Sequence, residues 1–166
     1  MMFSIRTLEL VNLRGENCNM RHRLIQRIII HCSATKVGQV CNAEIIDKWH
    51  RDKGYKKIGY HYVILPDGTI EKGREEYEIG AHCISYNSDS IGICYVGGLD
   101  EKGKPKDTRT PQQKIALRNL VDDICNRYKI KDIAGHNDYS NKACPCFNVR
   151  SEFSLSDDDN KDKDSD

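Results

Sequence analysis

A run of consecutive branched aliphatic residues, in the stretch RLIQRIIIHCSAT, constrains the fold of this 166-residue chain more than any other feature. The run does not alternate between apolar and polar residues, as a strand with one face in water would. It is also far shorter than the roughly 18 apolar residues of a membrane-spanning helix. The pattern therefore predicts a strand that is buried on both faces, lies centrally in a sheet and ends near His31.

Other segments predict the elements around this strand. The stretch NAEIIDKWHRDKG indicates a helix with Asn42 as N-cap, and TRTPQQKIALRNLVDDICNRY indicates a longer helix with Thr110 as N-cap and Pro111 in its first position. IGYHYVILPDGTIEKG predicts a β-hairpin, because the Pro-Asp-Gly triplet suits a tight turn. IGICYVGG and DIAG indicate two more strands. The order strand, helix, hairpin, strand, helix, strand predicts a single α/β domain, with a central mixed β-sheet flanked by helices.

Length and charge set the limits of this domain. A chain of this length is usual for one domain. Residues 1–24 show no clear period, so we expect an extension that the fold does not require. Residues 25–153 should form the domain, and residues 154–166, with six Asp against two Lys, an acidic disordered tail. The formal net charge is only +1 and Lys and Arg are scattered, which argues against a nucleic-acid partner.

The first thirty residues do not have the pattern of a secretory signal. They carry scattered charges, and no uninterrupted apolar segment precedes a small-residue cleavage site. We therefore expect a chain that is cytoplasmic at synthesis, is not bound to a membrane and is monomeric. Eight cysteines are spread from Cys18 to Cys146, and without a sign of secretion we expect them to be reduced.

The stretch GHNDYSNKACPC, at residues 135–146, gathers a histidine, a lysine and two cysteines. It is compatible with half of a metal site, with a thiol pair for redox chemistry, or with a turn whose cysteines are small apolar fillers. His31 ends one predicted strand and His136 follows another, so the two imidazoles meet if these strands are neighbours. Cys144 can return to the same point. Cys146 is a candidate fourth ligand, but the intervening proline should send the two cysteine side chains to opposite sides.

Two histidines and one cysteine suit a catalytic zinc ion. Such an ion takes three protein ligands and keeps its fourth position for water, whose pKa zinc lowers from about 15.7 to about 7. However, a lone histidine at a strand end is more often an ordinary polar residue, and buried free cysteines are common. Spacing alone therefore leaves the alternatives open.

Four segments in colinear order resemble the N-acetylmuramoyl-L-alanine amidase type 2 family: HCSAT at 31–35, GYHYVILPDGTIEKGRE at 59–75, GAHCISYNSDSIGICYVGG at 80–98 and GHNDYSNKACPCF at 135–147. The resemblance covers roughly residues 25–150. It is nearest to small phage endolysins of the T7 lysozyme type and extends to peptidoglycan recognition proteins. It implies a zinc-dependent hydrolase that cleaves the amide between N-acetylmuramic acid and L-alanine in peptidoglycan.

The resemblance also implies roles for individual residues. His31, His136 and Cys144 would hold one zinc ion. Tyr60 and Lys142 would be catalytic, because a hydroxyl and an ammonium group beside the metal can stabilise the oxyanion that forms at the amide. Tyr60 would also assist proton transfer to the departing amine.

Several further residues have two interpretations. In the family, the loop with His82 and Asn87 borders the substrate groove, so these side chains either bind substrate or stabilise the loop. His61 should lie in the core, since alternation along a strand directs it away from Tyr60. We expect His50 to be solvated. Cys146 departs from the family pattern, in which many relatives have serine or another small residue there.

Three classes of function remain open. The first is an amidase, either a phage or prophage lysis enzyme that reaches the wall through a membrane pore made by another protein, or a cytosolic enzyme that recycles muropeptides. The second is a non-catalytic peptidoglycan-binding module, which typically lacks the cysteine ligand. The third is a thiol redox protein, which leaves the other motifs unexplained. Because Tyr60, Lys142 and Cys144 are all present, we expect the enzyme, with peptidoglycan or muropeptides as its partner.

Overall fold

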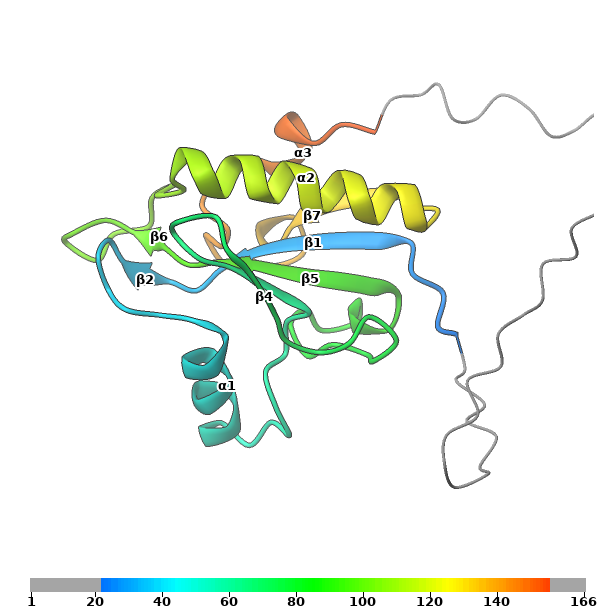
Figure 1. The fold of residues 1–166 in the computed structure, drawn as a ribbon, viewed down its shortest axis with the longest axis horizontal. Coiled ribbons are helices and arrows are strands. Elements are labelled where there is room, and N and C mark those ends of the chain that lie inside the picture. The colour runs from blue at the N-terminus through cyan, green and yellow to red at the C-terminus, as the bar shows by residue number, and fades with distance from the viewer. Residues whose placement is uncertain (1–21, 156–166) are drawn as a thin grey trace, which may run out of the picture.

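The computed structural model describes residues 22–155 (Figure 1). Its elements, in chain order, are β1 (Arg27–Cys32), β2 (Thr35–Lys36), α1 (Ala43–Asp52), β3 (Tyr62–Ile64), β4 (Ile70–Lys72), the short 3-10 helix η1 (Asn87–Asp89), β5 (Ser90–Tyr95), β6 (Gly98–Leu99), α2 (Pro111–Arg127), β7 (Asp132–Gly135), the 3-10 helix η2 (His136–Asp138) and α3 (Val149–Glu152). Nearly all of the expected N-terminal extension and acidic tail lies outside the described residues. Within residues 22–155, no helix has the length and apolar character needed to cross a membrane.

Five strands form the main sheet, in the order β4-β3-β5-β1-β7. β1 is parallel to both of its neighbours, β5 and β7, whereas β4 is antiparallel to β3. The mixed sheet and the hairpin predicted from the sequence are therefore confirmed. The three isoleucines Ile28, Ile29 and Ile30 in β1 are fully buried, as the absence of alternation predicted. Ile30 pairs with Gly135, so β1 and β7 end at the same edge of the sheet.

Helices cover both faces of the sheet, with α2 on one side and α1 on the other (Figure 1). The apolar stripe of α2, which includes Leu117 and Ile124, packs with β1 and β5 in the larger part of the core. Ile46 of α1 packs with residues of β3 and β5 in the smaller part. Both predicted N-caps are confirmed: Asn42 accepts a hydrogen bond from Ile45 N, and Thr110 forms a reciprocal capping box with Gln113.

The first strand of the hairpin is shorter than the sequence pattern indicates. β3 begins at Tyr62, so Tyr60 and His61 lie immediately before it and not inside the strand. The segment is still held to its neighbours, because His61 N donates to Gly92 O at 2.9 Å and Gly73 N donates to His61 O at 2.8 Å. These bonds hold the segment that carries Tyr60 between Gly92 of β5 and the residue that follows β4.

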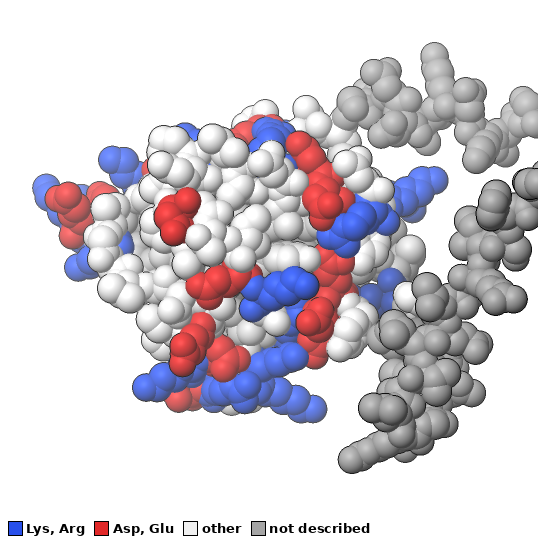
Figure 2. Space-filling model, viewed as in Figure 1, with Lys and Arg blue, Asp and Glu red and all other residues white. Residues whose placement is uncertain are grey.

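Charged side chains of both signs are interspersed on the face shown in Figure 2. Among the described residues, several charges form ion pairs, such as Arg109 with Glu152 and Arg150 with Asp132. This face thus has no continuous basic stripe of the kind that follows a nucleic-acid backbone.

Candidate metal centre

The parallel strands β1 and β7 bring two histidines together where both strands end. His31 is the fifth residue of β1, and His136 follows the last residue of β7. The loop after η2 returns Cys144 to the same point. One ligand atom from each of these three residues lies within 4.8 Å of the other two. The structure therefore brings together the three residues that the sequence nominated as metal ligands.

Backbone contacts fix Cys144 beside β1. Its Sγ accepts a hydrogen bond from Cys32 N at 3.2 Å and lies 3.9 Å from His31 Nδ1. Cys146 has a different environment, because its thiol donates to Gly98 O at 3.3 Å, and it does not belong to the three-residue cluster among the described residues. The cluster thus has the three-ligand composition of a catalytic site; a structural zinc site would have four protein ligands.

The two imidazoles of the cluster lie in an environment that keeps them neutral. His31 is only 1% exposed, and burial lowers its pKa well below the ordinary value, with further lowering by His82, His136 and Lys142. Burial also lowers the pKa of His136, and the charge of Lys142 adds to this effect. A neutral imidazole has a free ring nitrogen for a metal ion, so both histidines are in the ligating form at neutral pH.

The predicted catalytic residues lie next to this cluster. The ring centroid of Tyr60 is 5.0 Å from that of His31. Burial raises the pKa of Tyr60 well above its ordinary value, and neighbouring cysteines add to the rise, so its hydroxyl retains its proton and can donate. Lys142 is exposed, in the loop that delivers Cys144, and its positive charge acts on both histidines of the cluster.

The loop before β5 supplies a contact that sequence analysis missed. His82 Nδ1 lies 2.9 Å from His31 Nε2, and His82 Nε2 lies 3.2 Å from Ser90 Oγ. Asn87 Oδ1 accepts hydrogen bonds from the backbone N–H groups of His82 and Cys83, at 2.8 and 2.9 Å. The loop-stabilising interpretation of Asn87 thus has a structural basis, while a substrate contact by His82 or Asn87 stays a prediction.

Two other histidines have structural roles. His61 is fully buried, as predicted, and its Nδ1 accepts a hydrogen bond from Gly92 N at 3.0 Å. The prediction that His50 is solvated is wrong. His50 is half-buried, because α1 packs its last turn against the segment before β3, where His50 Nδ1 accepts a hydrogen bond from Gly59 N at 2.8 Å. Its ring also lies 5.4 Å from that of Tyr60.

Comparison with known proteins identifies the same family that the motifs resemble. The family profile described as N-acetylmuramoyl-L-alanine amidase matches residues 21–147. The chain is 42% identical to the endolysin of Escherichia phage T7 over 123 residues, which cover 74% of this chain and 82% of that protein. It is 32% identical to peptidoglycan-recognition protein SC2 of Drosophila melanogaster over 127 residues, which cover 74% of this chain and 66% of that protein.

Solved structures give the same result. The N-acetylmuramoyl-L-alanine amidase LysC from Clostridium intestinale superposes with a TM-score of 0.69 and 31% sequence identity, over 79% of this chain and 83% of that chain. The predicted fold class and the resemblance stated from the motifs are both confirmed. Since the family profile covers most of the sequence and a relative more than 40% identical is matched over most of its length, the chain belongs to the N-acetylmuramoyl-L-alanine amidase family.

Proposed function

We propose that this protein hydrolyses the amide between N-acetylmuramic acid and L-alanine in peptidoglycan, with one zinc ion held by His31, His136 and Cys144. The observation that carries the proposal is the cluster of two neutral imidazoles and one thiol at the end of β1 and β7. Nitrogen and sulfur donors in this number are those of catalytic zinc sites. When bound, zinc supplies a Lewis acid that polarises a carbonyl and acidifies water.

In this proposal, Tyr60 and Lys142 stabilise the negative charge that develops on the amide oxygen. Tyr60 donates a hydrogen bond, since burial keeps its hydroxyl protonated at neutral pH. Lys142 contributes a positive charge from an exposed position, where its flexible side chain can approach a bound substrate. We also assign to Tyr60, whose hydroxyl is protonated, a role in proton transfer to the departing amine.

The named relatives favour a lytic role for this activity. The matched phage proteins are endolysins, so we assign this chain to the lysis of bacterial walls from within the infected cell. It would be made in the cytoplasm and reach the wall through a pore made by another protein. A cytosolic enzyme that recycles muropeptides would have the same chemistry but would not act on intact walls.

Mass spectrometry of digestion products tests the reaction directly. Purified sacculi are incubated with the zinc-loaded protein under reducing conditions, and Cys144→Ala serves as the inactive control. We expect free stem peptides that begin at L-alanine, with the glycan left intact. Products from soluble muropeptides alone would favour the recycling enzyme. The absence of products from both substrates would contradict the proposal and favour a peptidoglycan-binding module.

A further inference from the structure

His82 occupies a slot that two glycines leave open. Gly92 lies inside β5, a strand whose six residues are all buried. A Cβ atom at Gly92 would lie 2.6 Å from His82 Cδ2 and 2.8 Å from His82 Nε2, and a Cβ atom at Gly80 would lie 2.6 Å from the same Cδ2. Glycine inside a strand often marks a close approach of another group. Here that group is the His82 ring, which lies directly against the sheet.

Hydrogen bonds also hold this ring in place. Both of its nitrogens have partners, His31 Nε2 at 2.9 Å and Ser90 Oγ at 3.2 Å. Ser90 is fully buried, and the backbone N–H of His82 donates to Asn87 Oδ1. The ring is therefore fixed by the loop, by the sheet and by both of its own nitrogens.

The direction of these hydrogen bonds follows from how His31 can bind a metal. His31 Nδ1 faces Cys144 Sγ at 3.9 Å, whereas its Nε2 faces His82. If Nδ1 is the ligand atom, the neutral ring carries its proton on Nε2 and donates it to His82 Nδ1. His82 then carries its own proton on Nε2 and donates it to Ser90 Oγ. One tautomer of each ring satisfies all of these contacts.

We propose that His82 is a positioning residue that fixes the tautomer and ring orientation of His31 for the metal, and that Gly92 provides the space for it. This inference rests on the zinc site of the proposed function, and it assigns His82 a role other than substrate contact. Partners of this kind are usual for metal-ligating histidines, and their loss typically weakens metal affinity by roughly 10- to 100-fold. Substitution of His82 leaves the three ligand residues unchanged. The expected loss of zinc affinity is therefore transmitted only through the orientation of His31.

Two substitutions at His82 separate the hydrogen bond from the volume of the ring. His82→Leu removes the acceptor but keeps much of the bulk, whereas His82→Asn places an amide oxygen near the position of Nδ1. The zinc dissociation constant of each full-length variant is measured by competition with a chromogenic chelator. We expect His82→Leu to bind zinc roughly 10- to 100-fold more weakly than the wild type, and His82→Asn to stay within about threefold.

A third variant, Gly92→Ala, displaces the same ring by a substitution in β5 and leaves His82 itself unchanged. Gly92→Ala alters no polar atom, but its methyl group would displace the His82 ring, so zinc affinity should also fall. His61→Asn is the control, because His61 is a buried histidine that accepts a hydrogen bond from Gly92 N and, among the described residues, has no hydrogen bond to His31. Urea unfolding of each metal-free protein monitors folding. A positioning role predicts a loss of zinc affinity in His82→Leu beyond any loss in His61→Asn.

The outcomes distinguish this inference from the proposed function. Wild-type protein that binds zinc but releases no stem peptides would contradict the function and leave the role of His82 intact. Unchanged zinc affinity in His82→Leu, with a raised KM for peptidoglycan, would overturn the inference and make His82 a substrate contact. Equal losses in His82→Leu and His61→Asn would also overturn it, since general loosening of the core would then explain both.

Discussion

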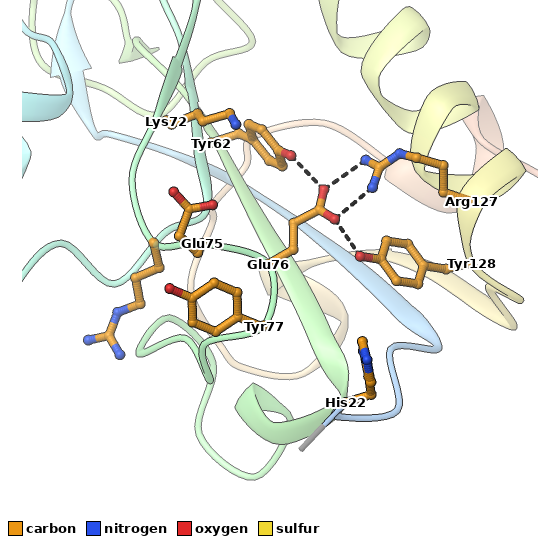
Figure 3. Close-up of a pocket in the computed structure, with 9 residues that line it drawn as sticks. His22, Tyr62, Lys72, Glu75, Glu76, Tyr77, Arg127 and Tyr128 are labelled. Atoms are coloured by element: carbon orange, nitrogen blue, oxygen red, sulfur yellow. Dashed lines mark hydrogen bonds and ion pairs between the residues drawn. The ribbon is translucent and has the colours of Figure 1, made fainter. Parts of the chain in front are cut away.

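Glu76 ties the loop after β4 to the end of α2, and its charge should stabilise the fold in a pH-dependent way. Its carboxylate accepts hydrogen bonds from the hydroxyls of Tyr62 and Tyr128 and from both terminal nitrogens of Arg127 (Figure 3). Burial alone would raise the pKa of Glu76, but these donors outweigh it and lower the pKa from 4.5 to about 2. Glu76→Gln removes the charge and nearly preserves the shape, so it isolates this contribution.

The size and sign of the effect follow from that pKa. Lowering a carboxyl pKa from 4.5 to about 2 corresponds to about 3 kcal/mol of stability at neutral pH. Glu76 is 17% exposed but Arg127 is 40% exposed, so solvent screening reduces the expected loss in Glu76→Gln to about 2 kcal/mol. Because the folded-state pKa is depressed, the contribution is complete above the ordinary pKa and is lost as the pH falls from there through about 2.

Urea unfolding of the wild type and of Glu76→Gln at pH 7 and pH 3.5 tests this reasoning. The free energies of unfolding should differ by about 2 kcal/mol at neutral pH, and the difference should narrow by about 1 kcal/mol at the acidic pH. Groups shared by the two proteins cancel in the difference. Glu75→Gln, at an exposed neighbouring position, should stay within about 0.5 kcal/mol of the wild type. A difference that is the same at both pH values would refute the role of the charge.

Three predictions concern the site. Cys144→Ala should abolish both zinc binding and stem-peptide release, while Cys146→Ser should retain both under reducing conditions; the reverse pattern would favour a thiol redox protein. Tyr60→Phe should lower kcat by about 100- to 1,000-fold with little change in the zinc dissociation constant, and steady-state kinetics on soluble muropeptides would measure it. A chelator should stop stem-peptide release and added zinc should restore it, whereas activity that persists in metal-free protein would exclude a zinc mechanism.

The fold was predictable where the residue pattern has one physical explanation. Three consecutive buried isoleucines require cover on both faces, which placed β1 in the middle of a sheet, and the order of the predicted elements supplied the flanking helices. The caps were equally clear, because Asn42 and Thr110 each precede an apolar period typical of a helix. The start of β3 was not predictable, since Tyr60 and Tyr62 have the same strand propensity and only pairing with β4 and β5 separates them.

The candidate site also has parts that the sequence could predict and parts that it could not. Its two histidine ligands lie at or just after strand ends and Cys144 lies in the loop after η2, and motif order together with chemistry was sufficient to nominate all three. Whether β1 and β7 are neighbours was a condition that the sequence could not test, and strand order in the structure supplies it. The contacts of His50 and His82 were missed because each depends on how a loop or a helix end packs on a distant segment. Such packing has no period in the sequence.

Gly92 shows why the support of a metal centre is harder to identify than its ligands. Inside a buried strand, glycine is less favourable than alanine by roughly 0.5–1 kcal/mol, so stability of β5 alone would favour a side chain at this position. A methyl group there would lie within 2.8 Å of three atoms of the His82 ring. A side chain at this position would therefore favour the strand but would exclude the His82 ring from its place beside His31. If the positioning role is correct, Gly92→Ala cannot improve strand β5 without moving the imidazole that orients a metal ligand.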